Sequence, residues 1–449
     1  MTQMKKRALA LLCSVGMLLT ILAGCGSGTA PDGANSSATS GEAGKEQGKV
    51  EITFWHTYTD TDAGPINKVV ESFNKSQDRI SVKMLGNQDS TKQLTAISGG
   101  AAPDILLTFW NNIGPWAEAG AIMELSDNIQ KDGFDVNALI QAAAERMSIH
   151  GKYYGMPFTM SMANSLLYNK KAFEEAGITA PPETLEQMFE IAKQLTKRDG
   201  SGNIKQIGFI PDYPWIDNVF WPIIFGGSWY DESTGKVTPN DPANVAAIAY
   251  QRSFYDEFGA DQIARFKSGM GKRGTPQDPM LTGQLAMYIG WEYNFRDERA
   301  EDGPIGVAPF PYPAAKPELK GAGMVSPRAI FIPAKAKHPA EAWEFMKYLM
   351  TQDAQIEFSL EAKVIPTIKA ALDDERLRTD ANKTMLPFLE AAKSENLEGF
   401  PNSSYINEYL QALSEETEKA LKGTQTPQEA MDKVAQKIQL IADKAAKKQ

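Results

Sequence analysis

Cysteine is almost absent from this 449-residue chain, and its two cysteines, Cys13 and Cys25, both lie near the N-terminus. Cys13 falls in a segment that we expect to be removed, so no second thiol remains for an internal disulfide. Histidine is equally scarce, because His56, His150 and His338 stand far apart without a His or Cys neighbour at metal-ligand spacing. The sequence therefore predicts neither a disulfide scaffold nor a zinc site.

Several catalytic and cofactor motifs are also missing. There is no G-x-S-x-G nucleophile elbow, and Phe266 stands where the first glycine of a phosphate-binding loop belongs. The segment from Asp199 to Asn203 begins like a calcium loop, but Ile210 takes the place of the bidentate glutamate, which favours a hairpin turn. No cofactor is expected. Paired carboxylates for glycosidic cleavage are not excluded, since a sequence does not show their separation in space.

Positive charge is in deficit. The chain has 46 Lys and Arg against 56 Asp and Glu, and removal of the three basic residues in 1–24 leaves 43 against 56, a net charge of −13. A chain of this charge is a poor ligand for nucleic acid and for an anionic membrane surface. Beyond the N-terminus no apolar run reaches the roughly 18 residues of a membrane span. The sequence thus predicts no nucleic-acid partner.

The N-terminus carries export signals. Residues 1–24 combine Lys5, Lys6 and Arg7 with an apolar run from Ala8 to Leu22, as a secretory signal peptide does. The four residues from Leu22 to Cys25 resemble the lipobox of bacterial lipoproteins, in which the cysteine receives the lipid. This resemblance implies that Cys25 anchors the chain to the extracellular face of a bacterial cell membrane.

Residues 25–49 are rich in Gly, Ser and Ala and contain almost no large apolar side chains, so we expect a flexible tether. About 400 residues follow, more than one hydrophobic core usually organises, and two lobes are therefore predicted. Strand-like runs alternate with amphipathic segments such as 66–74, 184–195 and 426–438, and the last two begin with the capping pairs Thr184 with Gln187 and Thr426 with Glu429. The order of these segments predicts an α/β fold.

Large aromatic side chains stand where predicted strands end. Trp55, Trp110, Trp229 and Trp291 each follow a strand-like run or a Gly turn. In open α/β sheets these ends face the ligand crevice, and a flat ring suits the C–H face of a sugar. The other tryptophans are Trp116, Trp215, Trp221 and Trp343; Trp343 is expected in the core, and the other three in the core or capping a loop.

Seven segments in order give a resemblance to a family. They include "ITFWHTYT", "SGGAAPDILLT", "LTGQLAMYIGWE" and "GAGMVSPRAIFIPAKAKHPAEAWEFMKYLMTQDAQ", and from about residue 50 onward the chain resembles family 1 extracellular solute-binding proteins, the carbohydrate receptors of ABC importers, of the maltose-binding-protein type. The resemblance implies a two-lobed, type II periplasmic-binding-protein-like fold with an interlobe cleft and a hinge. Residues 50–160 and 322–366 would form lobe 1, and residues 161–321 and 367–449 lobe 2.

The same resemblance implies a site, a role and partners. The expected ligand-binding residues are Trp55, His56, Tyr58, Trp110, Asn111, Trp229, Asp231, Trp291, Glu292, Gly323 and Arg328. Glu292 and Arg328 equally suit an ion pair with each other. A monomer would capture a sugar without catalysis and deliver it to the permease subunits of an importer. The alternatives are a tethered carbohydrate-active enzyme and a receptor for another solute, such as a polyamine.

Overall fold

The computed structural model describes residues 49–60, 62–213, 219–231, 234–292 and 303–447, which belong to one compact unit. The predicted leader, Cys25, nearly all of the tether and Trp215 lie outside these residues. Within the described ranges, no helix combines the length and the apolar character needed to cross a membrane.

A mixed sheet organises this unit. Its main path is β2-β1-β3-β13-β6-β11-β8-β7, while β12 and β14 pair with β6 and β15 pairs with β13. Its strands are β1 (Val50–His56), β2 (Ile80–Leu85), β3 (Ile105–Phe109), β6 (Met156–Asn169), β7 (Lys197–Arg198), β8 (Ile204–Phe209), β11 (Leu285–Trp291), β12 (Ile305–Pro309), β13 (Gly323–Phe331), β14 (Ile365–Pro366) and β15 (Leu397–Glu398). The strands β1, β2 and β3 are parallel, so their carboxyl ends share one edge of the sheet.

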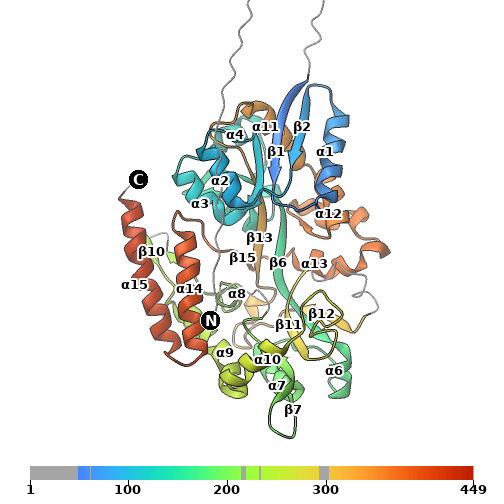
Figure 1. Cartoon of the computed structure of the whole chain (residues 1–449), viewed down its shortest axis with the longest axis vertical. Coiled ribbons are helices and arrows are strands. Elements are labelled where there is room, and N and C mark those ends of the chain that lie inside the picture. Colours follow the sequence, from blue (N-terminus) through green and yellow to red (C-terminus); the bar gives the residue numbers. More distant parts are fainter. Residues whose placement is uncertain (1–48, 61, 214–218, 232–233, 293–302, 448–449) are drawn as a thin grey trace, which may run out of the picture. The chain divides into compact units, whose positions relative to one another are not determined.

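Helices and short strands complete the α/β fold that the sequence predicts. The helices are α1 (Gly64–Ser76), α2 (Ser90–Ser98), α3 (Ile113–Glu118), α4 (Ser126–Asp132), α5 (Gln141–Glu145), α6 (Lys170–Glu175), α7 (Leu185–Leu195), α8 (Phe220–Ile224), α9 (Pro242–Phe258), α10 (Ala260–Gly269), α11 (Pro339–Leu349), α12 (Gln352–Ala362), α13 (Leu386–Ala391), α14 (Ile406–Leu421) and α15 (Pro427–Ala446). Two hairpins are formed by β4 (Ser148–Ile149) with β5 (Lys152–Tyr153) and by β9 (Tyr230–Asp231) with β10 (Lys236–Val237). Figure 1 shows α14 and α15 packed side by side.

Several helices begin where local sequence signals predict them. Thr184 and Gln187 form the predicted capping box of α7, and Thr426 and Glu429 form that of α15. Each box satisfies backbone N–H groups that the first turn would otherwise leave without partners. The hairpin predicted near Asp199 is also confirmed, since β7 and β8 pair as neighbours in antiparallel order.

The tryptophans expected in the core are buried where the structure describes them. Trp116, Trp221 and Trp343 expose 4%, 0% and 5% of their surface. The indole N–H of Trp343 donates to Asp132, which gives its polar edge a partner. Burial with a satisfied edge is the usual arrangement for a core tryptophan.

Long strands carry the chain through the middle of the sheet. The strand β6 pairs with β13 over Met324 to Ile330, and β14 pairs with β6 at Met160 and Thr159. Gly323 opens β13 so close to β6 that an added Cβ would lie 2.3 Å from the Cβ of Asn164. A side chain there would push the two strands apart, which explains the glycine.

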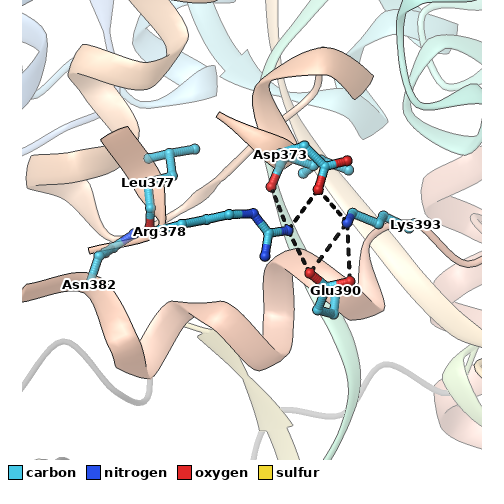
Figure 2. Close-up of polar contacts among 7 residues, drawn as sticks. Asp373, Leu377, Arg378, Asn382, Glu390 and Lys393 are labelled. Atoms are coloured by element: carbon cyan, nitrogen blue, oxygen red, sulfur yellow. Dashed lines mark hydrogen bonds and ion pairs between the residues drawn. The ribbon is translucent and has the colours of Figure 1, made fainter. Parts of the chain in front are cut away.

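Between β14 and α13 the chain makes three 3-10 turns, Lys369–Asp373, Glu375–Leu377 and Asp380–Met385. Figure 2 shows the ion network that ties this segment to α13, with the cations Arg378 and Lys393 between the carboxylates Asp373 and Glu390. Lys393 lowers the pKa of Asp373, and Arg378 lowers that of Glu390. The four charges therefore balance within one local cluster.

Candidate sugar-binding cleft

A cavity of about 410 Å³ lies at the shared carboxyl end of β1 and β3. It is lined by residues 57–59 after β1, by residues 89–91 at the start of α2, and by Asp62, Phe109 and Arg328. We call it the strand-end cavity. Its position is the edge at which open α/β sheets commonly bind ligands, and its volume lies within the range of small-molecule sites.

Arg328 is held between two aromatic rings of this cavity. Its guanidinium carbon lies 4.0 Å from the centre of the Phe109 ring and 5.6 Å from that of Tyr58. Its Nη1 donates to the hydroxyl of Thr57 at 3.3 Å. Stacking of this kind fixes the plane of the guanidinium and leaves its N–H groups directed sideways. The result is an oriented hydrogen-bond donor beside two flat apolar surfaces.

Acidic and hydroxyl groups also line the strand-end cavity. The hydroxyl of Thr59 donates to Asp62 at 2.9 Å, and Asp89 caps α2 by accepting from the backbone N–H of Lys92 at 2.9 Å. Ser90 is 3.0 Å from the hydroxyl of Thr108. These bonds orient carboxylates and hydroxyls that retain further acceptor capacity. The cavity thus combines acceptors, one guanidinium donor and aromatic faces, a set of groups that suits a polyhydroxylated ligand.

Tyr58 and Arg328 are the two expected site residues that line this cavity. His56 lies beneath it, buried among the rings of Phe54 and Tyr58 at 5.7 and 5.8 Å. Burial lowers the pKa of His56. Trp55 is partly buried and packs against the core.

The other expected residues lie elsewhere in the unit. Trp110 and Trp229 are buried, the first beside Arg146 and the second against Phe400 and Tyr409. Asn111 donates to Asn407 of α14 at 3.4 Å. The hydroxyl of Thr234 donates to Asp231 at 2.6 Å in the hairpin of β9 and β10.

Trp291 and Glu292 close the end of β11. Trp291 exposes 5% of its surface and pairs with Ala163 of β6 at a register shift. Glu292 is fully buried and accepts the backbone N–H of Met162 at 3.0 Å. The residues that follow, 293–302, are outside the described structure, so contact of Trp291 or Glu292 with a ligand stays a prediction. The same holds for an ion pair between Glu292 and Arg328.

Sequence patterns missed most of the strand-end cavity. Phe109, the last residue of β3, is 42% exposed, while Trp110, the first residue of the 3-10 helix Trp110–Asn112, is 8% exposed. The other four residues of β3 are all buried, so the strand shows no alternation that could have selected Phe109. Asp62 and Asp89 gave no signal either, since acidic residues are common in surface loops.

Comparison with known proteins agrees with this architecture. A model of the family "Bacterial extracellular solute-binding protein" matches residues 68–387. The maltotriose-binding protein of Pyrococcus abyssi is 22% identical over 353 residues, or 75% of this chain and 70% of that protein. The diacetylchitobiose binding protein DasA of Streptomyces coelicolor is 25% identical over 383 residues, covering 82% and 83%.

Solved structures share the fold. The structure described as CpMnBP1 with mannotriose bound is 25% identical, has a TM-score of 0.70 and covers 86% of this chain and 99% of its own. The sugar-binding protein MalE of Xanthomonas citri is 17% identical, with a TM-score of 0.73 and coverage of 88% and 98%. The expected two-lobed, type II periplasmic-binding-protein-like fold is thereby confirmed. With the family model matching most of its length, the chain belongs to the bacterial extracellular solute-binding proteins.

Proposed function

We propose that this protein captures a neutral mono- or oligosaccharide and delivers it to an ABC importer. The observation that carries the proposal is the stacked guanidinium of Arg328 between Phe109 and Tyr58 in a polar cavity at the strand ends. A sugar ring offers a C–H face to the aromatic rings and hydroxyls to Arg328, Asp62 and Asp89. The sugar-binding relatives of the chain support the same class of ligand.

The wall that carries Arg328 also carries the carboxylates of Asp62 and Asp89, so its charges alone do not select a neutral sugar over a polyamine. The preference for a sugar rests on the aromatic faces of the cavity and on the sugar-binding relatives. We further propose that the ligand leaves chemically unchanged, because proteins of this family bind solutes. Recovery of an intact oligosaccharide after long incubation supports this, and accumulation of new reducing ends contradicts it.

The strand-end cavity predicts a specific loss on mutation. Arg328→Ala removes an oriented donor from the binding site and should weaken saccharide affinity by about 2 kcal/mol, roughly thirtyfold. Calorimetric titration of wild type and variant with a panel of neutral mono- to trisaccharides measures the loss. Arg265→Ala is the matched control, since Arg265 lies on α10 and bonds Asn203. Failure of every saccharide to bind, or equal affinities of Arg328→Ala and wild type, overturns the proposal.

Movement of the two lobes would close the site over its ligand. The predicted lobe boundaries, between 160 and 161, before 322 and after 366, fall in or beside β6, β13 and β14, which are hydrogen-bonded neighbours. Adjacent crossing strands form a compact hinge. Small-angle scattering should therefore show a smaller particle with sugar than without it, and an unchanged particle contradicts hinge closure.

Anchoring at Cys25 completes the proposal. The segment from Leu22 to Cys25 has the residues of a lipobox, and a diacylglyceryl group brings two acyl chains, enough for stable attachment to a membrane. Held on the extracellular face, the receptor would meet the permease subunits of its importer by lateral diffusion. Cys25→Ala should move the protein out of the membrane fraction, and unchanged retention of correctly cleaved variant contradicts the anchor.

A further inference from the structure

A second cavity, of about 1400 Å³, shares no lining residue with the strand-end cavity. Its walls come from α3 and the residues after it, the hairpin of β4 and β5, residues 400–405 and the end of α15, and Arg146 also lines it. We call it the Arg146 cavity.

Arg146 is a buried cation that makes no salt bridge with the described residues, although the carboxylates of Glu145 and Glu398 favour its charged form. It exposes 6% of its surface, and its Nε and Nη1 have no hydrogen-bond partner among the described residues. Its guanidinium carbon lies 5.3 Å from the centre of the Trp110 ring, a contact that orients the charge without neutralising it. Buried charges in native proteins are usually paired, since an unpaired one loses its hydration without compensation.

Other buried polar atoms near Arg146 also have no hydrogen-bond partner among the described residues. The side-chain oxygens of Asn402 and Ser403, two residues that line the cavity, also have no partner among the described residues. The amide nitrogen of Asn402 donates to the backbone oxygen of Arg146, which holds these groups together. The set contains charged donors, a hydroxyl and an amide acceptor, so it can bind an anionic group and a hydroxyl at the same time.

The other charged side chains that line the Arg146 cavity are exposed, whereas Arg146 is buried. The carboxylates of Glu118, Glu145 and Asp443 line the cavity on exposed residues, and Lys152 is paired with Glu124. Burial lowers the pKa of Arg146 to about 9, while Glu145 and Glu398 act against this shift, so the guanidinium stays protonated at neutral pH. The buried charge of the cavity is therefore positive, whereas its exposed carboxylates are hydrated.

We propose that the Arg146 cavity is a second binding site, for a small oxyanion on a hydroxylated body. The oxyanion, a carboxylate or a phosphate group, would pair with the guanidinium of Arg146, and the hydroxylated body would meet Asn402 and Ser403. Arginine suits this role because its planar fork matches both oxyanions. The inference is independent of the sugar proposal, since neither Arg328 nor Phe109 lines this cavity.

Thermal melts with defined anions test the second site. Inorganic phosphate and gluconate are the two anionic probes, sorbitol is the neutral polyol, and chloride keeps the ionic strength equal. A ligand that binds only the folded state raises the Tm with its concentration. We expect at least one anion, and not sorbitol, to raise the Tm of wild type. Phosphate alone or gluconate alone identifies the oxyanion that binds.

Three variants locate the effect. Arg146→Gln should abolish the anion-dependent rise in Tm, and Arg146→Lys, which keeps the charge but not the fork, should reduce it. Arg265→Gln is the matched control, because Arg265 bonds Asn203 and lines neither cavity, so this variant should leave the rise unchanged. If Arg146→Gln does not fold, Arg146→Lys and quenching of tryptophan fluorescence in wild type by each anion decide the question. No response of wild type, or an equal response in the Arg146 variants, overturns the second site.

Discussion

Two arginine–aromatic pairs on adjacent residues of one strand end differ in almost every physical respect. Phe109 stacks on Arg328 at 4.0 Å beside an exposed polar cavity, whereas Trp110 lies 5.3 Å from Arg146 in the interior. Arg328 also bonds the hydroxyl of Thr57, while two nitrogens of Arg146 have no partner among the described residues. The same pairing of arginine with an aromatic ring thus gives an oriented guanidinium at the wall of a polar cavity in one place and a deeply buried guanidinium in the other.

The largest effect should come from the buried pair. Trp110→Ala removes an 8% exposed indole, leaves a cavity beside Arg146, and should cost about 3 to 5 kcal/mol of unfolding free energy. Denaturant unfolding of wild type and variant measures this difference. The affinity of the folded variant for sugar should change little. A variant with wild-type stability and much weaker sugar binding would instead place Trp110 in the sugar site.

For the exposed pair, Phe109 with Arg328, we expect a smaller effect that falls on sugar affinity and not on stability. Phe109→Ala removes a ring that is already 42% exposed, so the unfolding free energy should fall by less than about 1 kcal/mol. Loss of the stacking surface beside Arg328 should weaken sugar binding by roughly tenfold, or about 1.4 kcal/mol. Calorimetric titration and unfolding on the same preparation separate the two quantities. If stability falls and affinity does not, Phe109 is a packing residue and the contrast with Trp110 fails.

The smallest effect is expected for His56, which packs against Tyr58 of the strand-end cavity, and it concerns the pH dependence of stability. His56 is buried against Tyr58, and burial lowers its pKa, so the folded state favours the neutral ring. Above the pKa of about 6.5 that histidine has in the unfolded state, the ring of His56 is neutral in both states and its contribution to the free energy of unfolding is fully present. As the pH falls below that value, the unfolded state takes up the proton first, so the free energy of unfolding decreases.

His56→Gln should therefore lose stability less steeply than wild type between about pH 7 and pH 5. Melting curves of both proteins across this range, in one buffer system, give the two slopes. His150 and His338 remain in the variant and serve as the internal reference. Identical slopes would show that the folded state does not hold His56 in its neutral form, and would contradict a neutral support beneath the strand-end cavity.

Helices, caps and turns followed from sequence because their causes are local. The capping boxes of α7 and α15 each need one residue and a partner three positions later, and the turn near Asp199 needs only its own five residues. Burial of Trp116, Trp221 and Trp343 followed equally well, since a large apolar surface seeks the interior in any fold. The resemblance of ordered segments gave the family and the fold.

Tertiary structure alone decided which side chains meet. Arg328 joins Thr57 and Tyr58 because β13 pairs with β3, which pairs with β1, across hundreds of residues of sequence. The different exposure of Phe109 and Trp110 depends on the place where β3 ends and the 3-10 helix Trp110–Asn112 begins. Arg146 gave no signal in the sequence, and its burial beside Asn402 follows from tertiary packing. These contacts join segments far apart in the chain, and no short stretch of sequence contains the information that selects them.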